Sequence, residues 1–389
     1  MKFETTLGAR AAVQALAASK IRELYNEGIG RKNILAFWVG EPDEPTPEFI
    51  RKAATESIGA GELFYTHNLG IPELREALAA YITRLHRKTD PNQIAVTSAG
   101  VNALMLASQL LVDPGDHVVE AVPLWPNLQE IPKILGARVT TVPLDFAPTG
   151  WALNMEKLLT ALTPGTRALY LNSPNNPTGW TISREEQKTI LEHCRRHGIW
   201  ILADDAYERL YFGKGGVAPS FLDAMQGDDR LISTNTFSKS WLMTGWRLGW
   251  LVVPPSLVAD LGKLIEYNTS CTPIFVQRAG IAAVTEGERV IEHTRERFRR
   301  ARDFLVAGLR ELPKVEVAVP DGTMYVFLRV KGMTDSLAFC KRLVREQGLG
   351  LAPGSAFGPE GEGFLRWCFA AGIDKLADGI ARLRRALGD

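Results

Sequence analysis

The sequence predicts an α/β protein with two parts: a large domain holding a mostly parallel sheet between helices, and a smaller α+β domain formed by the N-terminal segment and the C-terminal third. Short apolar runs alternate with amphipathic segments from about residue 46 to about residue 285. Several of these runs are apolar on both faces, as expected for parallel strands that helices cover. After about residue 285, a long basic amphipathic segment leads into mixed strand-like and helical pieces.

The large domain starts with two expected helices. Thr46 precedes Pro47, which predicts a helix capped by the Thr46 side chain with proline at the first helical position. Another helix starts at Pro72, where apolar residues such as Leu74 and Leu78 follow helical spacing. The strand-like runs that follow are Gln93–Thr97, His117–Val122, Ala168–Asn172, Ile199–Ala203, Leu231–Thr234 and Leu248–Val253. Helical segments separate most of these runs, which favours a layered α/β core.

The C-terminal third predicts a smaller unit. The expected elements are a helix at 288–312, strands at 315–319 and 324–330, a helix at 334–347, an extended piece ending in 364–370, and a helix at 374–387. We therefore expect an N-terminal arm and part of the small domain at 1–45, the large domain at 46–285 and the small C-terminal domain at 286–389.

The composition narrows the class of protein. Lys plus Arg (45) nearly cancels Asp plus Glu (44) in the 389 residues, so no global field would attract nucleic acid or an anionic membrane. The N-terminus does not resemble a signal peptide, and no apolar run approaches the roughly 20 residues that span a bilayer. Four scattered cysteines without a CxxC pair argue against disulfides and structural zinc. We expect a cytoplasmic protein.

Two histidines, His193 and His197, lie four residues apart on an expected helix and could face one metal ion. Their surroundings are charged and lack the HExxH pattern, so we expect no metal there.

Chemically notable residues follow the expected strands, where open α/β sheets bind ligands. Lys239 lies in Thr236-Phe237-Ser238-Lys239-Ser240, shortly after a strand. Asp204 ends another strand, and a carboxylate there is costly unless a cation such as a protonated ring nitrogen pairs with it. Tyr207 could donate to a ring oxygen. Together these residues suggest covalent chemistry on an aldehyde cofactor, with Lys239 forming an imine.

Further residues suggest a phosphate and a carboxylate. Thr236 and Arg247 could both reach a phosphate, with Arg247 as a bidentate donor. The run 97–102 opens a helix whose N-terminus could bind an anion, although close packing would explain Gly100 equally well. Trp125 is either a residue of the hydrophobic core or a stacking partner for a flat ring. Asn176 lies in a predicted turn. Arg366 is either packed through its stem or a buried clamp for a carboxylate; we favour the clamp.

In combination, these motifs resemble the class I/II aminotransferases, the aspartate-aminotransferase-like, fold type I family of pyridoxal-phosphate enzymes. The resemblance runs from Gly40-Glu41-Pro42 to Arg366. It is carried by Asn175-Asn176-Pro177-Thr178-Gly179, by Asp204 with Tyr207, and by Ser238-Lys239 with Arg247, in this order.

The resemblance implies a pyridoxal-phosphate-binding large domain and specific roles. Lys239 would be the Schiff-base lysine and proton shuttle. Asp204 would hold the ring nitrogen protonated, Tyr207 and Asn176 would bind the ring oxygen O3′, and Trp125 would stack on the ring. The phosphate site would comprise Ala99, Gly100, Val101, Thr236 and Arg247, with Tyr65 reaching the neighbouring subunit's phosphate in a homodimer. The substrate α-carboxylate would be bound by Arg366, Asn176 and the Gly40 backbone.

This chain departs from the family at the phosphate loop. Ala99 and Val101 stand where the family often offers a hydroxyl. Backbone N–H groups, Ser98 or Asn102 are the expected replacements.

The resemblance implies transamination: an L-amino acid passes its amino group to a 2-oxo acid, 2-oxoglutarate by our expectation, in a ping-pong reaction. A lyase, such as a β C–S lyase, on the same fold is the alternative. A non-catalytic regulator is a remote one, because we expect no helix-turn-helix module beside the enzyme-like region.

The substrate side chain is expected to meet Phe37, Trp38, Tyr65, Trp125 and residues 268–272. Dicarboxylate specificity would need a second cation in this pocket, and the sequence alone does not identify one.

Overall fold

The fold centres on a sheet of eight strands, in the order β2-β9-β8-β7-β6-β3-β4-β5. A computed structural model describes residues 8–227 and 229–388, so residues 1–7 of the expected N-terminal arm lie outside the described residues. The strands are β2 (Ile94–Thr97), β3 (His117–Val122), β4 (Arg138–Ala147), β5 (Gly150–Leu153), β6 (Thr166–Asn172), β7 (Trp200–Asp204), β8 (Leu231–Thr236) and β9 (Gly249–Val252). All six predicted strands of the large domain are present.

Strand direction brings the polar segments to one edge of this sheet. Strands β4, β3, β6, β7 and β8 are mutually parallel, whereas β9 runs antiparallel to both β8 and β2. The carboxyl ends of β2, β3, β6, β7 and β8 therefore meet the start of β9 at the same edge. The mostly parallel α/β architecture that the sequence predicts is confirmed.

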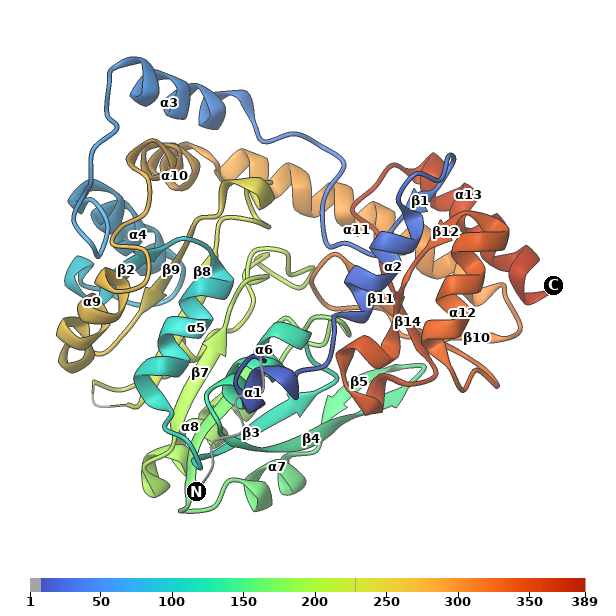
Figure 1. The fold of residues 1–389 in the computed structure, drawn as a ribbon, viewed down its shortest axis with the longest axis horizontal. Helices are drawn as coiled ribbons and strands as arrows, with labels where there is room; N and C mark the ends of the chain where they lie inside the picture. The colour runs from blue at the N-terminus through green and yellow to red at the C-terminus, as the bar shows by residue number, and fades with distance from the viewer. Residues whose placement is uncertain (1–7, 228, 389) are drawn as a thin grey trace.

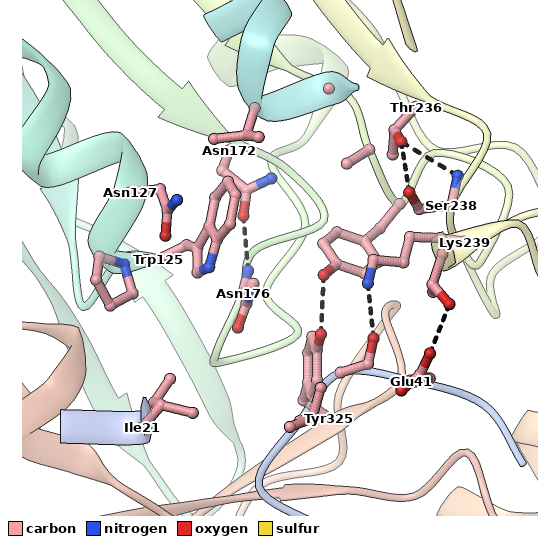
Figure 2. Close-up of a pocket in the computed structure, with 18 of the residues that line it drawn as sticks. Ile21, Glu41, Trp125, Asn127, Asn172, Asn176, Thr236, Ser238, Lys239 and Tyr325 are labelled. Atoms are coloured by element: carbon pink, nitrogen blue, oxygen red, sulfur yellow. Dashed lines mark hydrogen bonds between the residues drawn. The ribbon is translucent and has the colours of Figure 1, made fainter. Parts of the chain in front are cut away.

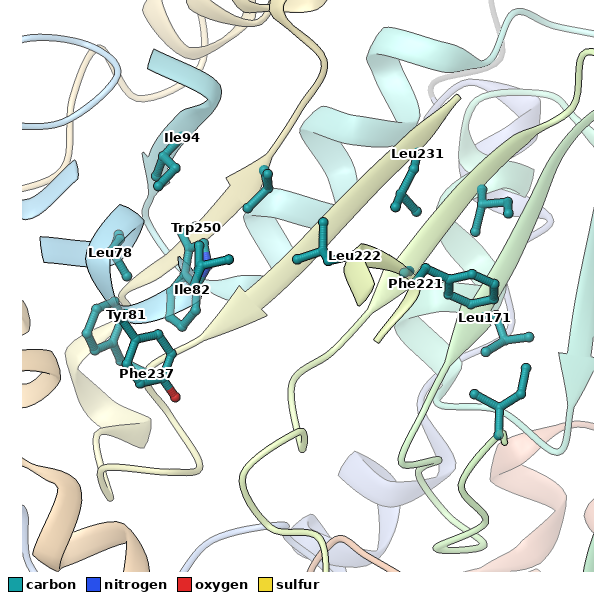
Figure 3. Close-up of a cluster of buried hydrophobic side chains, with 14 of the residues drawn as sticks. Leu78, Tyr81, Ile82, Ile94, Leu171, Phe221, Leu222, Leu231, Phe237 and Trp250 are labelled. Carbon is teal, nitrogen blue, oxygen red and sulfur yellow. The ribbon is translucent and has the colours of Figure 1, made fainter. Parts of the chain in front are cut away.

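Helices cover both faces of the large sheet. Side chains from α5 (Gly100–Leu111), α6 (Pro126–Ile134) and α9 (Val258–Glu266) form the core on one face. The other face packs against α4 (Pro72–Leu85), α7 (Met155–Ala161), α8 (Arg184–His197) and α10 (Ile274–Glu286), with α3 (Glu48–Gly59) outside α10. Figure 3 shows part of this second core, where Leu78 lies near Phe237 and Trp250. Burying each such side chain contributes about 1.5–3 kcal/mol.

A second sheet, in the order β10-β11-β14-β13, is antiparallel and belongs to the C-terminal third. Its strands are β10 (Val315–Val317), β11 (Tyr325–Val330), β13 (Ala352–Pro353) and β14 (Phe364–Cys368), and its helices are α11 (Glu288–Arg310), α12 (Ser336–Arg342) and α13 (Ile373–Leu387). This is the smaller α+β part that the sequence predicts.

The N-terminal segment joins the C-terminal third, as predicted. It contains α1 (Ala11–Gln14), α2 (Lys20–Gly28) and β1 (Leu35–Ala36), and β1 pairs in parallel with β12 (Leu349–Gly350). In Figure 1, α2 and β1 lie beside the C-terminal elements at the right of the view. The exact domain boundaries at residues 45 and 285 stay a prediction.

Two local expectations were incomplete or wrong. The sequence did not reveal the antiparallel hairpin of β4 and β5, because most of β4 is exposed and lacks a long apolar run. The predicted Thr46 cap is absent: Pro47 is the N-cap of α3 and Thr46 makes no cap hydrogen bond. Instead, the Thr46 hydroxyl donates to the Leu242 carbonyl at 2.6 Å, a contact across 196 residues that outweighs the local cap.

None of the helices in the described part of the chain is both long and apolar enough to cross a bilayer.

Candidate active site

A cavity of about 460 Å³ opens where the carboxyl edge of the large sheet meets the N-terminal segment and the smaller sheet. Most of the predicted site residues line it: Trp38, Gly40, Gly100, Val101, Trp125, Asn176, Asp204, Tyr207, Thr236, Lys239, Arg247 and Arg366. Figure 2 shows how side chains from distant parts of the sequence converge there. Ala99 and Tyr65, both predicted for the phosphate site, do not line this cavity.

Asp204 is the last residue of β7 and lies at the base of the cavity, 6% exposed. Burial raises the pKa of its carboxyl to about 6, although the Ala206 N–H and nearby Lys239 act in the opposite direction. The N–H of Ala206 donates to Asp204 Oδ1 at 3.2 Å. On the neighbouring strand β6, Asn172 Nδ2 donates to the Asp204 carbonyl at 3.0 Å. The carboxylate is therefore held firmly, and its desolvation would be offset by a cation in the cavity.

Lys239 lies three residues beyond β8, so its side chain starts from the same sheet edge. Its Nζ donates to the Gly40 carbonyl at 2.7 Å and lies 5.9 Å from the centre of the Tyr207 ring. Gly40 has a steric reason to lack a side chain, since a Cβ there would lie 1.8 Å from the Tyr325 hydroxyl. The amine is thus fixed against a backbone segment 199 residues away in sequence.

Tyr207 is buried beside Lys239. Its hydroxyl shares a 3.0 Å hydrogen bond with the hydroxyl of Tyr325 from β11. Burial, followed by the neighbouring Tyr325, raises the pKa of Tyr207 well above its ordinary value. The phenol therefore stays protonated and can donate a hydrogen bond.

The end of the cavity where the sequence predicts a phosphate is built from backbone and hydroxyl groups. Gly100 begins α5 after Ala99, which takes a φ of 136° at the N-cap. A Cβ at Gly249 would lie 2.5 Å from the Gly100 nitrogen, so only glycine lets these strand and helix ends meet. Thr236 Oγ1 donates to Ser238 Oγ at 2.9 Å. A helix N-terminus beside two hydroxyls is a suitable anion site.

Arg247 closes this end of the cavity. It adopts a left-handed conformation with a φ of 52°, and its Nη1 donates to the Thr244 carbonyl at 2.6 Å. Such a constrained backbone for an arginine is uncommon and indicates that the surrounding structure directs the side chain.

Arg366 is a buried cation on β14, 3% exposed. Its Nη1 donates to Asn176 Oδ1 at 3.0 Å, and its Nη2 donates to the Trp38 carbonyl. Its Cζ lies 4.3 Å from the centre of the Tyr325 ring, while Nε is buried without a partner among the described residues. An anion would complete this site, because a buried guanidinium without a carboxylate carries an uncompensated charge.

These features fit a flat, phosphorylated aldehyde cofactor. Asp204 could hold a protonated ring nitrogen, Trp125 at the start of α6 could cover a ring face, and the Gly100 end could bind phosphate. The donor set matches this chemistry without a metal, and among the described residues there is no cluster of three or more metal-ligating side chains.

Several residues that line the cavity were missed by the sequence analysis. Asn172 ends β6 and could have been found by the same strand-end rule that identified Asp204. Ser238 supplies a second hydroxyl at the phosphate end, whereas the expected replacements, Ser98 and Asn102, do not line the cavity. Tyr325 could not be recognised as a site residue from the sequence, because its surroundings are those of any aromatic residue in a buried strand.

The expected side-chain pocket needs two corrections. Phe37 is wrong as a lining residue: it is 4% exposed and its ring lies 5.1 Å from that of Trp367 in the core. Residues 268–272 do not line the cavity either, and Asn268 instead accepts a hydrogen bond from Asn102. The cavity is also lined by Ser19, Ile21, Arg22 and Tyr25 of the N-terminal segment, none of which was predicted from the sequence.

Comparison with known proteins supports the same assignment. The family model "Aminotransferase class I and II" matches residues 32–382. The chain is 32% identical to an aspartate aminotransferase of Pyrococcus horikoshii over 383 residues, 96% of either chain. It is 34% identical to an arginine–pyruvate transaminase of Pseudomonas aeruginosa over 355 residues, 90% of this chain and 89% of that one. A Thermus thermophilus aspartate aminotransferase single mutant superimposes with a TM-score of 0.91 at 30% identity, covering 98% of this chain and 100% of that chain.

The fold and the family match define a pyridoxal-phosphate-dependent enzyme of fold type I. The chain belongs to the class I and II aminotransferases, and transamination is the reaction that this family supports.

Proposed function

We propose that this enzyme moves the amino group of an L-amino acid to a 2-oxo acid, with 2-oxoglutarate as the acceptor. The reaction is ping-pong, and Lys239 carries the cofactor covalently between turnovers. The observation that carries this proposal is the convergence of Lys239, Asp204 and Arg366 on one cavity from three distant parts of the chain. Lys239 offers the amine, Asp204 a counter-ion for a ring nitrogen, and Arg366 a cation that can bind a carboxylate.

Pyridoxal phosphate supplies an aldehyde carbon that takes up the amino group and a ring that accepts electron density from the substrate Cα. Asp204 keeps the ring nitrogen protonated, because a buried carboxylate with a raised pKa gains most from an adjacent cation. Tyr207, from its protonated hydroxyl, and Asn176 would both donate to O3′. Ala99, Gly100, Val101, Thr236 and Arg247 would hold the phosphate.

Lys239 would move the proton between the substrate Cα and the cofactor carbon that takes up the amino group. The Gly40 carbonyl accepts a hydrogen bond from Nζ at 2.7 Å and so holds the amine on one side of the cavity. A positioned proton donor and acceptor of this kind typically accelerates a reaction by about 10²–10⁴-fold.

Arg366 binds the α-carboxylate that amino acids and 2-oxo acids share. Asn176 and the Trp38 carbonyl keep the guanidinium in place, and Gly40 lines the same cavity. One clamp serves both the donor and the acceptor, which therefore occupy the site in turn. This alternation supports ping-pong kinetics.

We also propose a cytoplasmic homodimer in which Tyr65 completes the neighbouring phosphate site. Tyr65 is 90% exposed, and Phe64 and Tyr267 are similarly exposed. Exposed aromatic groups of this size often mark a protein interface. The four cysteines are free, which fits a reducing compartment.

The test is an absorption titration of the protein with pyridoxal phosphate, using single amino acids without a 2-oxo acid. We expect the visible band of the bound cofactor to be replaced by a near-ultraviolet band, and 2-oxoglutarate to restore it. A persistent visible band with accumulating pyruvate and ammonia would instead indicate a lyase. The complete absence of a visible band in folded protein would contradict the role of Lys239.

A further inference from the structure

The charged residues around the active-site cavity differ in whether their charged group has a hydrogen-bond partner. Five of the six have a hydrogen bond to their charged group: Lys239, Arg247, Arg366, Asp204 and Glu41. The sixth is Arg22 of α2. Among the described residues its guanidinium has no hydrogen-bond or ion-pair partner, and its Cζ lies 5.0 Å from the centre of the Tyr25 ring. A cation at the wall of a substrate cavity without an acid partner is available for a ligand.

We propose that Arg22 binds the side-chain carboxylate of acidic amino acids and of the corresponding 2-oxo acids. The inference deepens the proposed function and rests on it. Arg22 is then a specificity-determining residue supplied by the same chain, and the favoured substrates carry two carboxylates. Arg366 takes the α-carboxylate and Arg22 takes the distal one.

The position of α2 supports this assignment. In Figure 2, Ile21, the neighbour of Arg22, lies on the opposite side of the cavity from Lys239 and Glu41. A substrate held near Lys239 would therefore extend its side chain toward α2. Glu41 does not compete there, because its carboxylate accepts a hydrogen bond from the Thr244 hydroxyl at 2.8 Å on the far side.

The helix that carries Arg22 is fixed to the rest of the molecule. Lys20 Nζ donates to the Ser355 carbonyl at 3.1 Å, and Glu23 forms an ion pair with Lys341 of α12. The Ser19 hydroxyl caps the helix by accepting from the Arg22 N–H at 3.2 Å. The backbone of Arg22 is thus held at the cavity wall while its side chain stays exposed. A fixed backbone lowers the ordering cost of binding an anion with that side chain.

The same geometry allows neutral side chains. Because Arg22 is exposed, its guanidinium can turn into solvent and leave Ile21 and Trp38 as an apolar wall. We therefore expect a preference for acidic substrates rather than rejection of neutral ones.

The experiment compares L-glutamate with L-glutamine, which has the same shape without the charge, as donors for the holoenzyme. We expect Arg22→Met to lower kcat/KM for glutamate by about tenfold to a hundredfold, the value of one charge-assisted hydrogen-bonded contact, and to change glutamine little. Arg22→Lys should recover part of the loss. Arg31→Met is the matched control, because Arg31 lies just after α2, pairs with Glu27 and does not line the cavity.

A binding measurement separates recognition from chemistry. Glutarate, an unreactive dicarboxylate, should bind the holoenzyme more tightly than pentanoate in calorimetry, and Arg22→Met should remove that difference. The proposal is overturned if the glutamate-to-glutamine ratio or the glutarate-to-pentanoate ratio is the same in wild type and Arg22→Met. Failure of the proposed function would look different, because neither amino acid would then be transaminated by the wild-type enzyme.

Discussion

The inner end of the active-site cavity and its mouth are built in different ways. At the inner end, Asp204, Asn176 and Thr236 are each at most 6% exposed, and hydrogen bonds to neighbouring groups hold them. At the mouth, Arg22 and Tyr25 of α2 are exposed, and Tyr25 is 41% exposed. The inner end comes from the edge of an eight-stranded sheet, whereas the mouth comes from one nine-residue helix.

This difference separates the chemistry from the choice of substrate. Groups that act on the reacting atoms must be preorganised, and strand ends in a buried sheet supply rigid positions for them. Side chains that recognise different substrates benefit from freedom to move, which an exposed helix surface provides. Substitutions at the inner end should therefore abolish or strongly reduce turnover, and substitutions at the mouth should change selectivity.

The largest effect is expected for Lys239→Ala. Without the amine, no side chain in the described part of the cavity replaces the proton carrier, so kcat should fall by on the order of 10⁴-fold. Borohydride reduction of the wild-type holoenzyme followed by mass spectrometry should place the cofactor on Lys239. Lys263→Ala is the control, since Lys263 is an exposed residue of α9 paired with Asp260. Modification of another lysine would contradict the assignment.

Asp204→Asn should reduce kcat by about 10²–10³-fold while the fold is retained, because the amide keeps the shape but loses the charge that stabilises a ring cation. Single-turnover absorption measurements would show whether the loss lies in the chemical step. Unchanged kinetics would exclude Asp204 as the partner of the ring nitrogen.

Although Asp204→Asn should be less active than the wild type, the cofactor-free variant should be more stable. Burial raises the pKa of Asp204 in the folded chain from 3.8 to about 6. Folding therefore takes up a proton between about pH 4 and pH 6, and the wild-type free energy of unfolding falls as the pH rises through this range. Above pH 6, cofactor-free Asp204→Asn should be more stable by on the order of 1–3 kcal/mol. Urea denaturation at pH 4 and pH 8 checks this, and a pH-independent difference would contradict it.

Gly40→Ala should have an intermediate effect. Its Cβ would collide with the Tyr325 hydroxyl, and the resulting shift would misplace the carbonyl that holds Lys239. Overpacking of this kind costs about 1–3 kcal/mol, and we expect kcat to fall about tenfold to a hundredfold. Adding Tyr325→Phe removes the clashing oxygen and should recover part of the activity. No recovery in the double variant would show that the clash with the hydroxyl is not the cause.

The smallest effect is expected for Tyr25→Ala at the mouth. Tyr25 is exposed, the Arg22 guanidinium lies over its ring, and the Trp38 ring packs against it in a T-shaped arrangement. Because none of these groups acts on the reacting atoms, kcat should change by less than about threefold. Comparing the KM values of individual amino acids between wild type and Tyr25→Ala detects any shift in selectivity. A loss as large as that of Gly40→Ala would remove the distinction between the two ends of the cavity.

Much of the inner end could be predicted from the sequence. Six of the eight strands of the large sheet are recognisable in the sequence as apolar runs, several of them apolar on both faces. Lys239, Asp204, Tyr207 and Asn176 each end or follow one of these strands. Lys239, Asp204 and Thr236 therefore share a sheet edge once the parallel order is assumed. Residue type then limits the chemistry, since a lysine, a buried aspartate and a phenol in this order have few other common uses.

The mouth could not be predicted in the same way. Arg22 lies in an amphipathic helix like many others. Tyr325 begins the buried strand β11 and Phe37 follows the short strand β1, and no local pattern sets either apart from other aromatic residues. The Thr46 hydroxyl donates a hydrogen bond to the distant Leu242 carbonyl and does not cap the local helix. In each case the role depends on a partner far along the chain, such as the 199 residues between Gly40 and Lys239.

The sequence by itself determined the fold class, the family and the residues suited to the chemistry, because strand periodicity and strand-end residues are local properties. Only the tertiary structure decided that Phe37 joins the core, that Tyr325 contacts Tyr207, and that α2 forms a wall of the cavity. Side chains of the same type in the same local pattern take different roles because they make different long-range contacts. Those contacts exist only in the folded chain.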